Sequence, residues 1–335
     1  MNILFYCPFN FDLKSKSLNH LGGIETLNLG LSRLLADKGY KIFLSTNCKK
    51  IIKRKNLTNL PIDKVLTKNN KIKFDYIISS NDTQIFDFYK FSKKIFWMHN
   101  TLAIEKAIRK KKLLTLIRNK ITAVFVSKYL KNVTSKIYLF NNKIVIPNFL
   151  SKEFNKVRIN YKRKKIIIWS VQRKRGLQET LDMWIKSVYP TNKDAMFYVF
   201  GVNKNNYSQK ISFYKNHNIF FFGRVSKIKL RNIYSNSIGM ICLGYDETFC
   251  LNAIEAMRMG LPIITLGKTA LNEIIEDKKN GYLTDSIDNI DKLIFNLIDL
   301  DTPRRDSLSK YCIKFASNYN SNIIFKDWEK LICSN

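Results

Sequence analysis

Short apolar runs alternate along the chain with longer segments whose leucines and isoleucines recur at helical spacing, a pattern typical of α/β folds. The pattern opens with an apolar run at 2–7, a helical segment that ends at Gly39 and a second run at 41–45, which predicts a βαβ unit. It starts again at 166–170, after a charged stretch at 150–165 that we interpret as a linker.

Two α/β domains are therefore expected, since 335 residues are too many for one ordinary core. We place the domains at residues 1–150 and 151–318, and we assign 319–335 to a C-terminal helix. Residues 104–120 are expected to form one strongly basic helix, and residues 49–55 a basic loop. Further apolar runs predict strands at 74–79, 95–98, 122–126, 143–146, 196–201 and 219–223.

The stretch from Gly239 to Thr265 constrains the function more than any other. It predicts a strand at 240–243, an acidic loop, a helix from about Thr248 to Met259 and a second strand near Leu261. Thr248 is a candidate N-cap, and Gly260 stands where a left-handed residue commonly ends a helix.

Two carboxylates frame the predicted helix, Glu247 at its mouth and Glu255 about two turns along it. A rise of ~1.5 Å per residue separates them by at most roughly 12 Å along the axis, about the reach of a diphosphate with a sugar at each end. The amides at a helix N-terminus can bind phosphate, and the glutamates can accept hydrogen bonds from hydroxyl groups. This arrangement suits a nucleotide sugar. The alternative is that Glu247 caps the helix and Glu255 is a solvated helix residue.

Three cations, Arg173, Lys174 and Arg175, crowd the junction between the strand at 166–170 and the next helix. They are either exposed surface charges or the positive charge that a bound diphosphate needs. The glycine pair Gly22 and Gly23 precedes the first helix. Such a pair is either a simple turn or a place where the backbone approaches a ligand closely.

His99 follows the strand at 95–98 and is one of three histidines in the chain. A histidine in this position is either structural or catalytic. The only D-x-D sequence, Asp299-Leu-Asp301, stands beside a proline late in the chain, and we interpret it as a loop or a helix cap. It therefore offers no metal site.

The string Glu247-Thr-Phe-Cys-Leu-Asn-Ala-Ile-Glu255-Ala-Met, followed by Gly260-Leu-Pro-Ile-Ile, resembles the donor-site signature of the retaining GT-B glycosyltransferases of family 4. Cys250 replaces the usual small residue, a departure that we interpret as a packing variant. The loop that ends in Gly-Gly-Ile-Glu resembles a glycine loop of the same family. The run from Ser170 to Leu177 resembles its phosphate loop in the variant that ends in Arg-Gly-Leu, although this chain compresses the usual spacing between Arg and Lys-Gly.

The resemblance implies a GT-B fold, with two Rossmann-like domains facing across a cleft and the last helix returning to the first domain. It implies that Glu247 engages the transferred sugar, that Glu255 binds the ribose hydroxyls, and that Arg175, with Lys174 second, neutralises the leaving diphosphate. The remaining assignments that it implies are His99 near the donor sugar, Gly22 and Gly23 as donor-phosphate or acceptor-side contacts, Arg173 beside the phosphates, Thr248, Phe249, Cys250 and Leu251 at the diphosphate, and Arg224 and Val225 at the nucleobase.

The expected activity is transfer of a hexose-type sugar, with retention of configuration, from a UDP- or GDP-sugar to a glycan or lipid-linked acceptor in cell-surface polysaccharide or lipopolysaccharide synthesis. Cations and amides take the place of a divalent metal, so neither a metal nor another cofactor is expected. The alternatives are a GT-B-like protein that has lost catalysis and only binds, a sugar-nucleotide epimerase of the same architecture, and a basic nucleic-acid-binding protein.

The formal net charge of +32 indicates an anionic partner, namely a membrane leaflet, a nucleic acid or phosphorylated substrates. The abundance of Lys, Asn, Ile, Phe and Tyr allows a second explanation, drift in AT-rich coding DNA. The chain lacks the aromatic platform or recognition-helix motifs of nucleic-acid readers, so no nucleic-acid partner is expected. The basic segment at 104–120 either touches anionic lipid headgroups or presents a solvated charged face.

No run approaches the ~18 apolar residues of a membrane span, and the chain opens directly on a predicted strand. We therefore expect a cytoplasmic protein, with peripheral contact at the inner face of the membrane as a hypothesis. The six cysteines contain no C-x-x-C pair, which predicts reduced, packed thiols rather than a zinc site.

Overall fold

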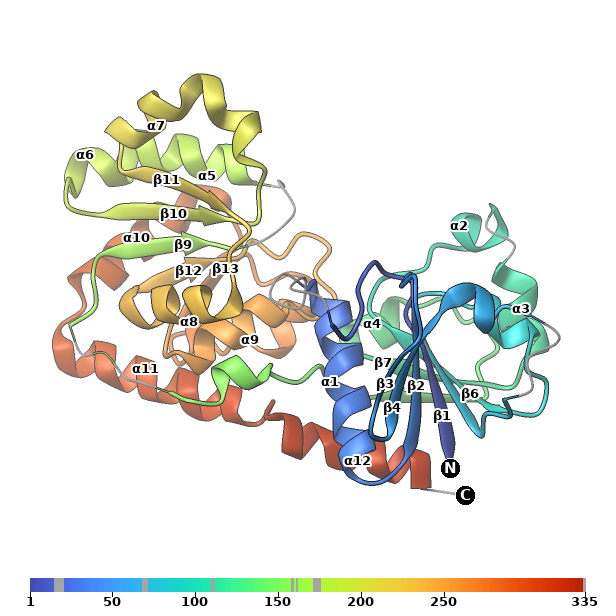
Figure 1. Cartoon of the computed structure of the whole chain (residues 1–335). Helices are drawn as coiled ribbons and strands as arrows, with labels where there is room; N and C mark the ends of the chain where they lie inside the picture. Colours follow the sequence, from blue (N-terminus) through green and yellow to red (C-terminus); the bar gives the residue numbers. More distant parts are fainter. Residues whose placement is uncertain are drawn as a thin grey trace. The chain divides into compact units, whose positions relative to one another are not determined.

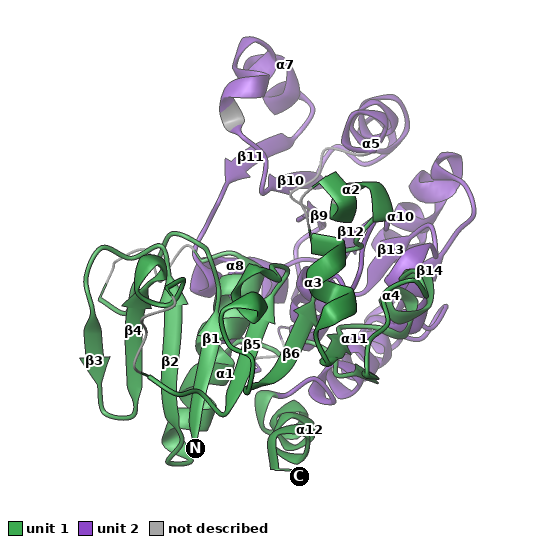
Figure 2. Cartoon of the chain, turned by 90° about the vertical axis from the view of Figure 1, so that its right-hand side faces the viewer, with its two compact units in different colours: residues 1–151, 321–335 green, residues 152–320 purple. Residues whose placement is uncertain are grey.

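The computed structural model describes residues 1–14, 21–67, 72–109, 112–157, 160, 162–170 and 176–333. The chain folds into two compact units (Figure 2). Unit 1 comprises residues 1–151 together with 321–335, and unit 2 comprises residues 152–320.

Unit 1, whose residues 1–151 run from blue to green in Figure 1, is built on an eight-stranded sheet in the order β3-β4-β2-β1-β5-β6-β7-β8, and only β3 runs antiparallel to its neighbour. The part of this order from β3 to β6 can be followed in Figure 2. β1 pairs with β2 on one side and with β5 on the other, so strand addition changes direction beside β1. The strands are β1 (Asn2–Tyr6), β2 (Lys41–Thr46), β3 (Ile52–Arg54), β4 (Leu57–Pro61), β5 (Tyr76–Ser80), β6 (Lys93–Met98), β7 (Ile121–Phe125) and β8 (Asn142–Val145). The helices are α1 (Gly23–Asp37), η2 (Ile62–Lys64), η3 (Gln84–Asp87), α2 (Ile104–Arg109), α3 (Lys112–Arg118), α4 (Lys128–Val133) and α12 (Ser321–Cys333).

The C-terminal helix α12 packs on unit 1, although unit 2 precedes it in the sequence. The ring of Trp328 is fully buried and lies 4.7 Å, centroid to centroid, from the ring of Trp97 on β6. Tyr40, just before β2, also reaches the helix, with its hydroxyl 3.2 Å from the Cys333 sulfur. An aromatic pair of this kind contributes roughly 0.5–1.5 kcal/mol beyond its buried area, which makes Trp328 the anchor of the helix.

Unit 2 contains a six-stranded, fully parallel sheet in the order β11-β10-β9-β12-β13-β14. All four residues of the central strand β9 are buried, as expected for a parallel sheet covered on both faces. The strands are β9 (Ile166–Trp169), β10 (Met196–Phe200), β11 (Ile219–Gly223), β12 (Gly239–Ile241), β13 (Ile263–Thr265) and β14 (Gly281–Leu283).

Helices of several kinds connect the strands of unit 2. The α-helices are α5 (Leu177–Met183), α6 (Tyr189–Thr191), α7 (Ile211–Asn216), α8 (Lys227–Asn236), α9 (Leu251–Arg258), α10 (Ile290–Asp299) and α11 (Thr302–Ser317). The others are η4 (Lys152–Phe154), the π-helix η5 (Trp184–Val188), η6 (Lys204–Lys210), η7 (Thr269–Glu273) and η8 (Ile287–Asn289). Asp301 caps α11 by accepting from the Arg304 amide at 2.8 Å, so interpreting the D-x-D sequence as a cap is confirmed.

The described parts of the basic segment at 104–120 form the helices α2 and α3, and residues 110 and 111 lie outside the described residues. One expectation about local structure was wrong. The expected loop at 49–55 contains β3, which pairs with β4 through a turn at Lys55, whose φ is 46°. The expected linker at 150–165 contains the boundary between the two units, and two of its described residues have contacts within unit 2: Phe154 is fully buried, and the Arg163 guanidinium donates to main-chain carbonyls.

Truncating the Trp328 side chain should destabilise unit 1. We expect Trp328→Ala to lower the free energy of unfolding by about 3–5 kcal/mol, the usual cost of removing a buried large aromatic side chain. Ile323→Ala on the same helix is the matched control, because Ile323 is 49% exposed, and it should cost less than about 1 kcal/mol. Urea unfolding followed by circular dichroism measures both. Equal losses in the two variants would contradict the anchoring role of Trp328.

Candidate functional site

The strand order of unit 2 places a switch point between β9 and β12. The chain extends the sheet from β9 through β10 to β11, and then returns to add β12 on the other side of β9. In open parallel sheets, ligands bind outside the carboxyl ends of the strands at such a point. The two segments that leave these ends begin at Ser170, after β9, and at Cys242, after β12.

Gly176 brings the end of the first segment against the second. It is the N-cap of α5, and its φ of 78° lies in the left-handed region that glycine tolerates best. A Cβ atom at this position would clash with a Leu243 methyl group and would lie 3.1 Å from the Tyr245 ring. A larger residue would therefore displace the Leu243 side chain and adopt a strained backbone.

The loop between β12 and α9 has an unusual backbone. Gly244, Asp246 and Cys250 have φ values of 82°, 57° and 60°, and a non-glycine residue in this region costs roughly 1 kcal/mol or more. The loop is held from outside, because the Thr269 hydroxyl donates to the Gly244 carbonyl at 2.7 Å and the Ala270 amide donates to the Glu247 carbonyl at 3.1 Å. The tertiary structure thus keeps this loop in a conformation that its sequence alone does not favour.

The predicted start of the helix was wrong. Helix α9 begins at Leu251 with the left-handed Cys250 as its N-cap, and Thr248 is part of the preceding loop. Glu247 is therefore a half-buried loop residue, and a distance based on helical rise does not apply to the Glu247 to Glu255 pair. The error came from Thr248, whose residue type favours capping, whereas the fixed loop geometry places the first turn later.

The predicted end of the helix is confirmed. Gly260 is left-handed, with a φ of 73°, and its amide donates to the Met257 carbonyl at 2.8 Å, while the Leu261 amide donates to Ala256 at 3.0 Å. Arg163 then donates to the Met259 and Ser237 carbonyls at 2.8 and 2.9 Å. Burial lowers the pKa of Arg163 to about 10, and the guanidinium pins the C-terminal ends of α9 and α8.

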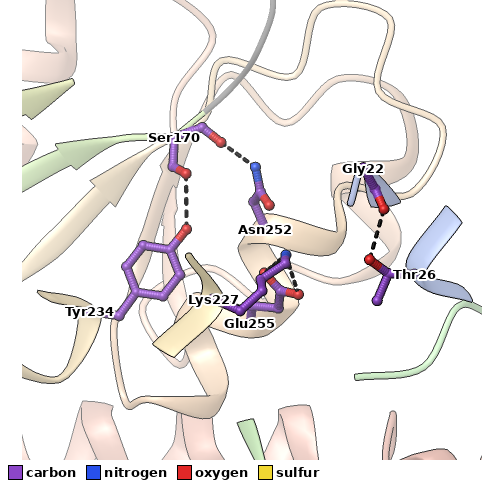
Figure 3. Close-up of polar contacts among 7 residues, drawn as sticks. All are labelled: Gly22, Thr26, Ser170, Lys227, Tyr234, Asn252 and Glu255. Carbon is purple, nitrogen blue, oxygen red and sulfur yellow. Dashed lines mark hydrogen bonds and ion pairs between the residues drawn. The ribbon is translucent and has the colours of Figure 1, made fainter. Parts of the chain in front are cut away.

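Glu255 lies on α9 with no exposed surface, which excludes the solvated alternative. The Nζ atom of Lys227 donates to both carboxylate oxygens, at 2.7 Å to Oε1 and 2.6 Å to Oε2 (Figure 3). Burial raises the pKa of Glu255, and the positive charge and hydrogen bonds of Lys227 act in the opposite direction. Among the described residues, Lys227 is thus the cation that favours the charged form of Glu255.

A second polar cluster joins α8, α9 and the end of β9 (Figure 3). The Tyr234 hydroxyl donates to the Ser170 hydroxyl at 3.0 Å, and the side-chain amide of Asn252 donates to the Ser170 carbonyl. Tyr234 is fully buried, and burial, followed by the nearby Glu255 charge, raises its pKa well above the usual value. The cluster holds Ser170, the residue at which the segment that carries Arg173, Lys174 and Arg175 leaves the sheet.

The three residues at the junction of the loop and α9 play different parts. Phe249 is buried and packs edge-on against the Tyr319 ring at 5.7 Å, so its side chain is structural. The Cys250 sulfur lies 3.3 Å from that of Cys242, and both thiols are free. Leu251 is the first residue of α9, where main-chain amides have no partner within the helix. Any contact with a ligand here would come from the backbone.

The predicted phosphate cations Arg173, Lys174 and Arg175 lie outside the described residues, so their roles stay predictions. Arg224 is exposed and Val225 half-buried, in the turn between β11 and α8. This turn also leaves a carboxyl end of the sheet, but the strand order places β10 between it and β9.

In unit 1, Gly22 is the N-cap of α1 and Gly23 its first residue (Figure 3), and the Thr26 hydroxyl donates to the Gly22 carbonyl at 2.8 Å. A Cβ atom on Gly22 would lie 2.6 Å from a carboxylate oxygen of Glu25. A carboxylate at this distance repels a phosphate group and can accept from a hydroxyl. Both predicted roles of Gly22 and Gly23, the donor-phosphate contact and the acceptor-side contact, stay predictions.

His99 is 6% exposed and directly follows β6. Its amide donates to the side-chain oxygen of Asn81 at 2.9 Å, and its ring lies 4.7 Å from the Trp97 ring. Burial lowers the pKa of His99 to about 3, so the imidazole is neutral at physiological pH. Such a ring can share a hydrogen bond with a sugar hydroxyl but is a weak proton acceptor.

The sequence reasoning missed Lys227 and the pair of Tyr234 and Asn252. One signal for Lys227 was present: it directly follows Ser226, whose side chain caps α8. A cation in the first turn of a helix opposes the helix dipole, which suggests that another interaction holds it there. Nothing in the local sequence marks Tyr234 or Asn252.

Residues 151–315 match the protein family described as Glycosyl transferases group 1. This range contains the candidate site at the carboxyl ends of β9 and β12. Spore coat protein SA of Bacillus subtilis (strain 168) is 31% identical over 127 residues, which cover 36% of this chain and 33% of that protein. This chain thus aligns with about a third of the length of that relative.

Solved structures resemble the whole chain. Among them is WaaG, a glycosyltransferase involved in lipopolysaccharide biosynthesis, with a TM-score of 0.74 and 10% identity, covering 99% of this chain and 100% of that chain. Another is Alr3699/HepE of Anabaena in complex with UDP and glucose, with a TM-score of 0.74 and 13% identity over 100% of both chains. The predicted fold class, GT-B with two Rossmann-like α/β domains and a C-terminal helix, is confirmed.

The burial of neutral His99 predicts a loss of stability in acid. The unfolded chain binds a proton at this residue below a pH of about 6.5, whereas the folded protein binds it only near pH 3. Stability should therefore fall as pH drops below about 6.5, by at most ~1.4 kcal/mol per pH unit from this residue. Urea unfolding at pH 7 and pH 5 should show a smaller drop for His99→Gln than for the wild type.

His217→Gln is the control, because it removes the half-buried histidine that follows α7 in unit 2. It should leave the acid-dependent drop as large as in the wild type. An unchanged drop in His99→Gln would show that the ring at position 99 is not held neutral by burial.

Proposed function

We propose that the chain is a retaining glycosyltransferase that moves a hexose-type sugar from a UDP- or GDP-sugar to a glycan or lipid-linked acceptor. The observation that carries this proposal is the position of the Glu247 to Glu255 segment at the carboxyl ends of β9 and β12. That is where an open parallel sheet binds its ligand, and the segment falls within the range that matches the glycosyltransferase family. A role in cell-surface polysaccharide or lipopolysaccharide synthesis is supported by the likeness to WaaG.

Glu247 and Glu255 have different roles in this proposal. Glu247 lies in the loop and is half-buried, and it would hold hydroxyls of the transferred sugar. Glu255 lies about one turn along α9, charged and paired with Lys227, and it would accept from the ribose hydroxyls. Neither glutamate would act as the acid and base pair of a hydrolase, because the paired and buried Glu255 is poorly placed to exchange protons with water.

The leaving group is a nucleoside diphosphate, whose charge grows as the bond to the sugar breaks. The first-turn amides of α9 and the cations at 173–175 would stabilise that charge, which is the task of a divalent metal in other transferases. We therefore propose metal-independent transfer. Phe249, Cys250 and Leu251 would contribute through their backbone, and Arg224 with Val225 would border the base.

Unit 1 would supply the acceptor side. Gly22 and Gly23 begin α1 at the carboxyl end of β1, beside the switch point of that sheet, and the Glu25 carboxylate next to them suits hydroxyl groups. His99 would offer a neutral ring to a sugar hydroxyl. These features favour a glycan acceptor, free or carried on a lipid.

We further propose peripheral contact with an anionic membrane through α2 and α3. Ile108, Leu114 and Ile117 on these helices are 57%, 56% and 40% exposed, and the cations Arg109 and Arg118 lie among them. Apolar side chains among cations suit the interface of an anionic bilayer. Among the described residues, no helix combines the length and apolar character needed to cross a membrane.

Replacing Glu247 or Glu255 by alanine should impair different properties of the enzyme, turnover for Glu247 and nucleotide affinity for Glu255. Glu255→Ala should weaken nucleoside diphosphate binding by about ten-fold or more, since it removes an acceptor of charge-assisted hydrogen bonds. Glu247→Ala should lower turnover with little change in nucleotide affinity. Thermal shift with UDP, GDP, ADP and their sugars identifies the donor, and calorimetry and release of the free nucleotide then measure the two effects.

Asp194→Asn is the matched control for both variants. This exposed carboxylate precedes β10, at the amino end of the sheet, and its substitution should change neither quantity. The proposal fails if no nucleoside diphosphate shifts the melting temperature and no nucleotide sugar is turned over with any glycan or lipid acceptor.

Membrane contact should depend on the exposed apolar residues of α3. Leu114→Glu with Ile117→Glu should reduce flotation with vesicles that contain about a third anionic lipid, because both side chains face solvent. The control is Phe213→Glu on α7, which changes an apolar residue of unit 2 that is 50% exposed. Flotation of the wild type should also fall in high salt. Equal flotation with neutral and anionic vesicles would argue against this contact.

A further inference from the structure

Lys227 is the accessible member of a pair whose other member is buried. It is the first residue of α8, and its side chain is 24% exposed, whereas that of Glu255 is not exposed at all. Its ammonium group also lies 5.8 Å from the centroid of the Phe154 ring. A solute that approaches the carboxylate from solvent on this side therefore meets Lys227 first.

Among the described residues, Lys227 is the charged group that favours the ionised form of Glu255. Lys227 favours the carboxylate, while burial and the negative charge of Glu153 on η4 oppose it. Tyr234, from the same helix as Lys227, is buried nearby and directs its hydroxyl to Ser170 instead. Without the ammonium group, no cation among the described residues would compensate the buried carboxylate, which favours its protonated form.

The hydrogen-bonding capacity of the pair leaves room for a ligand. A carboxylate offers about four lone-pair positions on two oxygens, and Lys227 occupies one on each oxygen. Lysine carries three donors on a flexible stem, so a change of rotamer can keep one of these hydrogen bonds and release the other oxygen. The released oxygen can then accept from a hydroxyl group.

We propose that Lys227 is a positioning residue for the donor: it holds Glu255 as a carboxylate anion and yields one oxygen to a ribose hydroxyl of the nucleotide. The inference rests on the proposed function and adds a residue to it. A purely structural ion pair would stabilise unit 2 without affecting the preference of the protein for a ribonucleotide over a deoxynucleotide. The proposed role makes discrimination between ribose and deoxyribose depend on Lys227. It also makes this discrimination depend on pH once Lys227 is replaced.

The test compares affinities of the full-length protein for a nucleoside diphosphate and for its 2′-deoxy and 3′-deoxy forms. The nucleotide is the one of UDP, GDP and ADP that stabilises the wild type most. We expect the wild type to prefer the ribonucleotide over at least one deoxy form by about ten-fold, the size of one hydrogen bond to a charged group, with little change between pH 6 and pH 9.

In Lys227→Met the preference should shrink to less than about two-fold at pH 6 and grow as pH rises, because a higher pH restores the carboxylate that the lost cation no longer maintains. Lys227→Gln, which is polar but uncharged, should behave in the same way and serves if the methionine variant does not fold. Lys229→Met is the control, since Lys229 is an exposed cation two residues along the same helix, and it should match the wild type.

Two results would overturn the inference while leaving sugar transfer from a nucleotide donor as the proposed activity. One is a wild type that binds the ribonucleotide and both deoxy forms equally, which would place the ribose away from Glu255. The other is a loss of affinity in the Lys227 variants that is the same for all three nucleotides at every pH, as a structural ion pair would give. A wild type that binds no nucleotide at all would instead overturn the proposed function, and the inference with it.

Discussion

A fully buried carboxylate requires a partner, and the candidate site is organised around the way in which Lys227 meets that requirement for Glu255. The pair joins the first turn of α8 to the middle of α9, so the helices on either side of the proposed nucleotide position cannot shift independently. Arg163 fixes the other ends of the same two helices through their terminal carbonyls. Two cations, one at each end, thus set the spacing of the helices that frame the site.

The same region concentrates backbone strain. The loop after β12 holds Asp246 and Cys250 in left-handed conformations and is kept there by hydrogen bonds from Thr269 and Ala270. Strain of this kind persists where the surroundings fix the backbone, and it is commonly found at functional sites. Here the left-handed Cys250 is the N-cap, so α9 begins only at Leu251 and its first turn directly follows a loop of fixed conformation. A fixed loop suits a diphosphate because the amides need no reorganisation when charge develops.

The fold was largely predictable from the sequence, whereas the contacts within the site were not. Strand β11 was predicted at its observed bounds, and helix α12 lies within the predicted segment 319–335, because apolar periodicity carries that information. The position of Gly260 followed from its residue type. The start of α9 was missed because tertiary hydrogen bonds overrode the capping preference of Thr248. The partner of Glu255 was missed because Lys227 lies 28 residues away in sequence, and only the packing of α8 on α9 brings the two together. The contacts of Arg163 were missed for the same reason, since a half-buried arginine cannot be told from a surface arginine by its sequence context.

The central claim is that a nucleoside diphosphate binds at the carboxyl ends of β9 and β12 in unit 2. Hydrogen–deuterium exchange with and without a saturating nucleoside diphosphate tests it most directly. The account predicts slower exchange in the loop from Cys242 to Cys250 and in the first turn of α9, with little change at β14 or α10. Protection confined to unit 1, or none in the β12 to α9 segment under conditions where the nucleotide is bound, would contradict it.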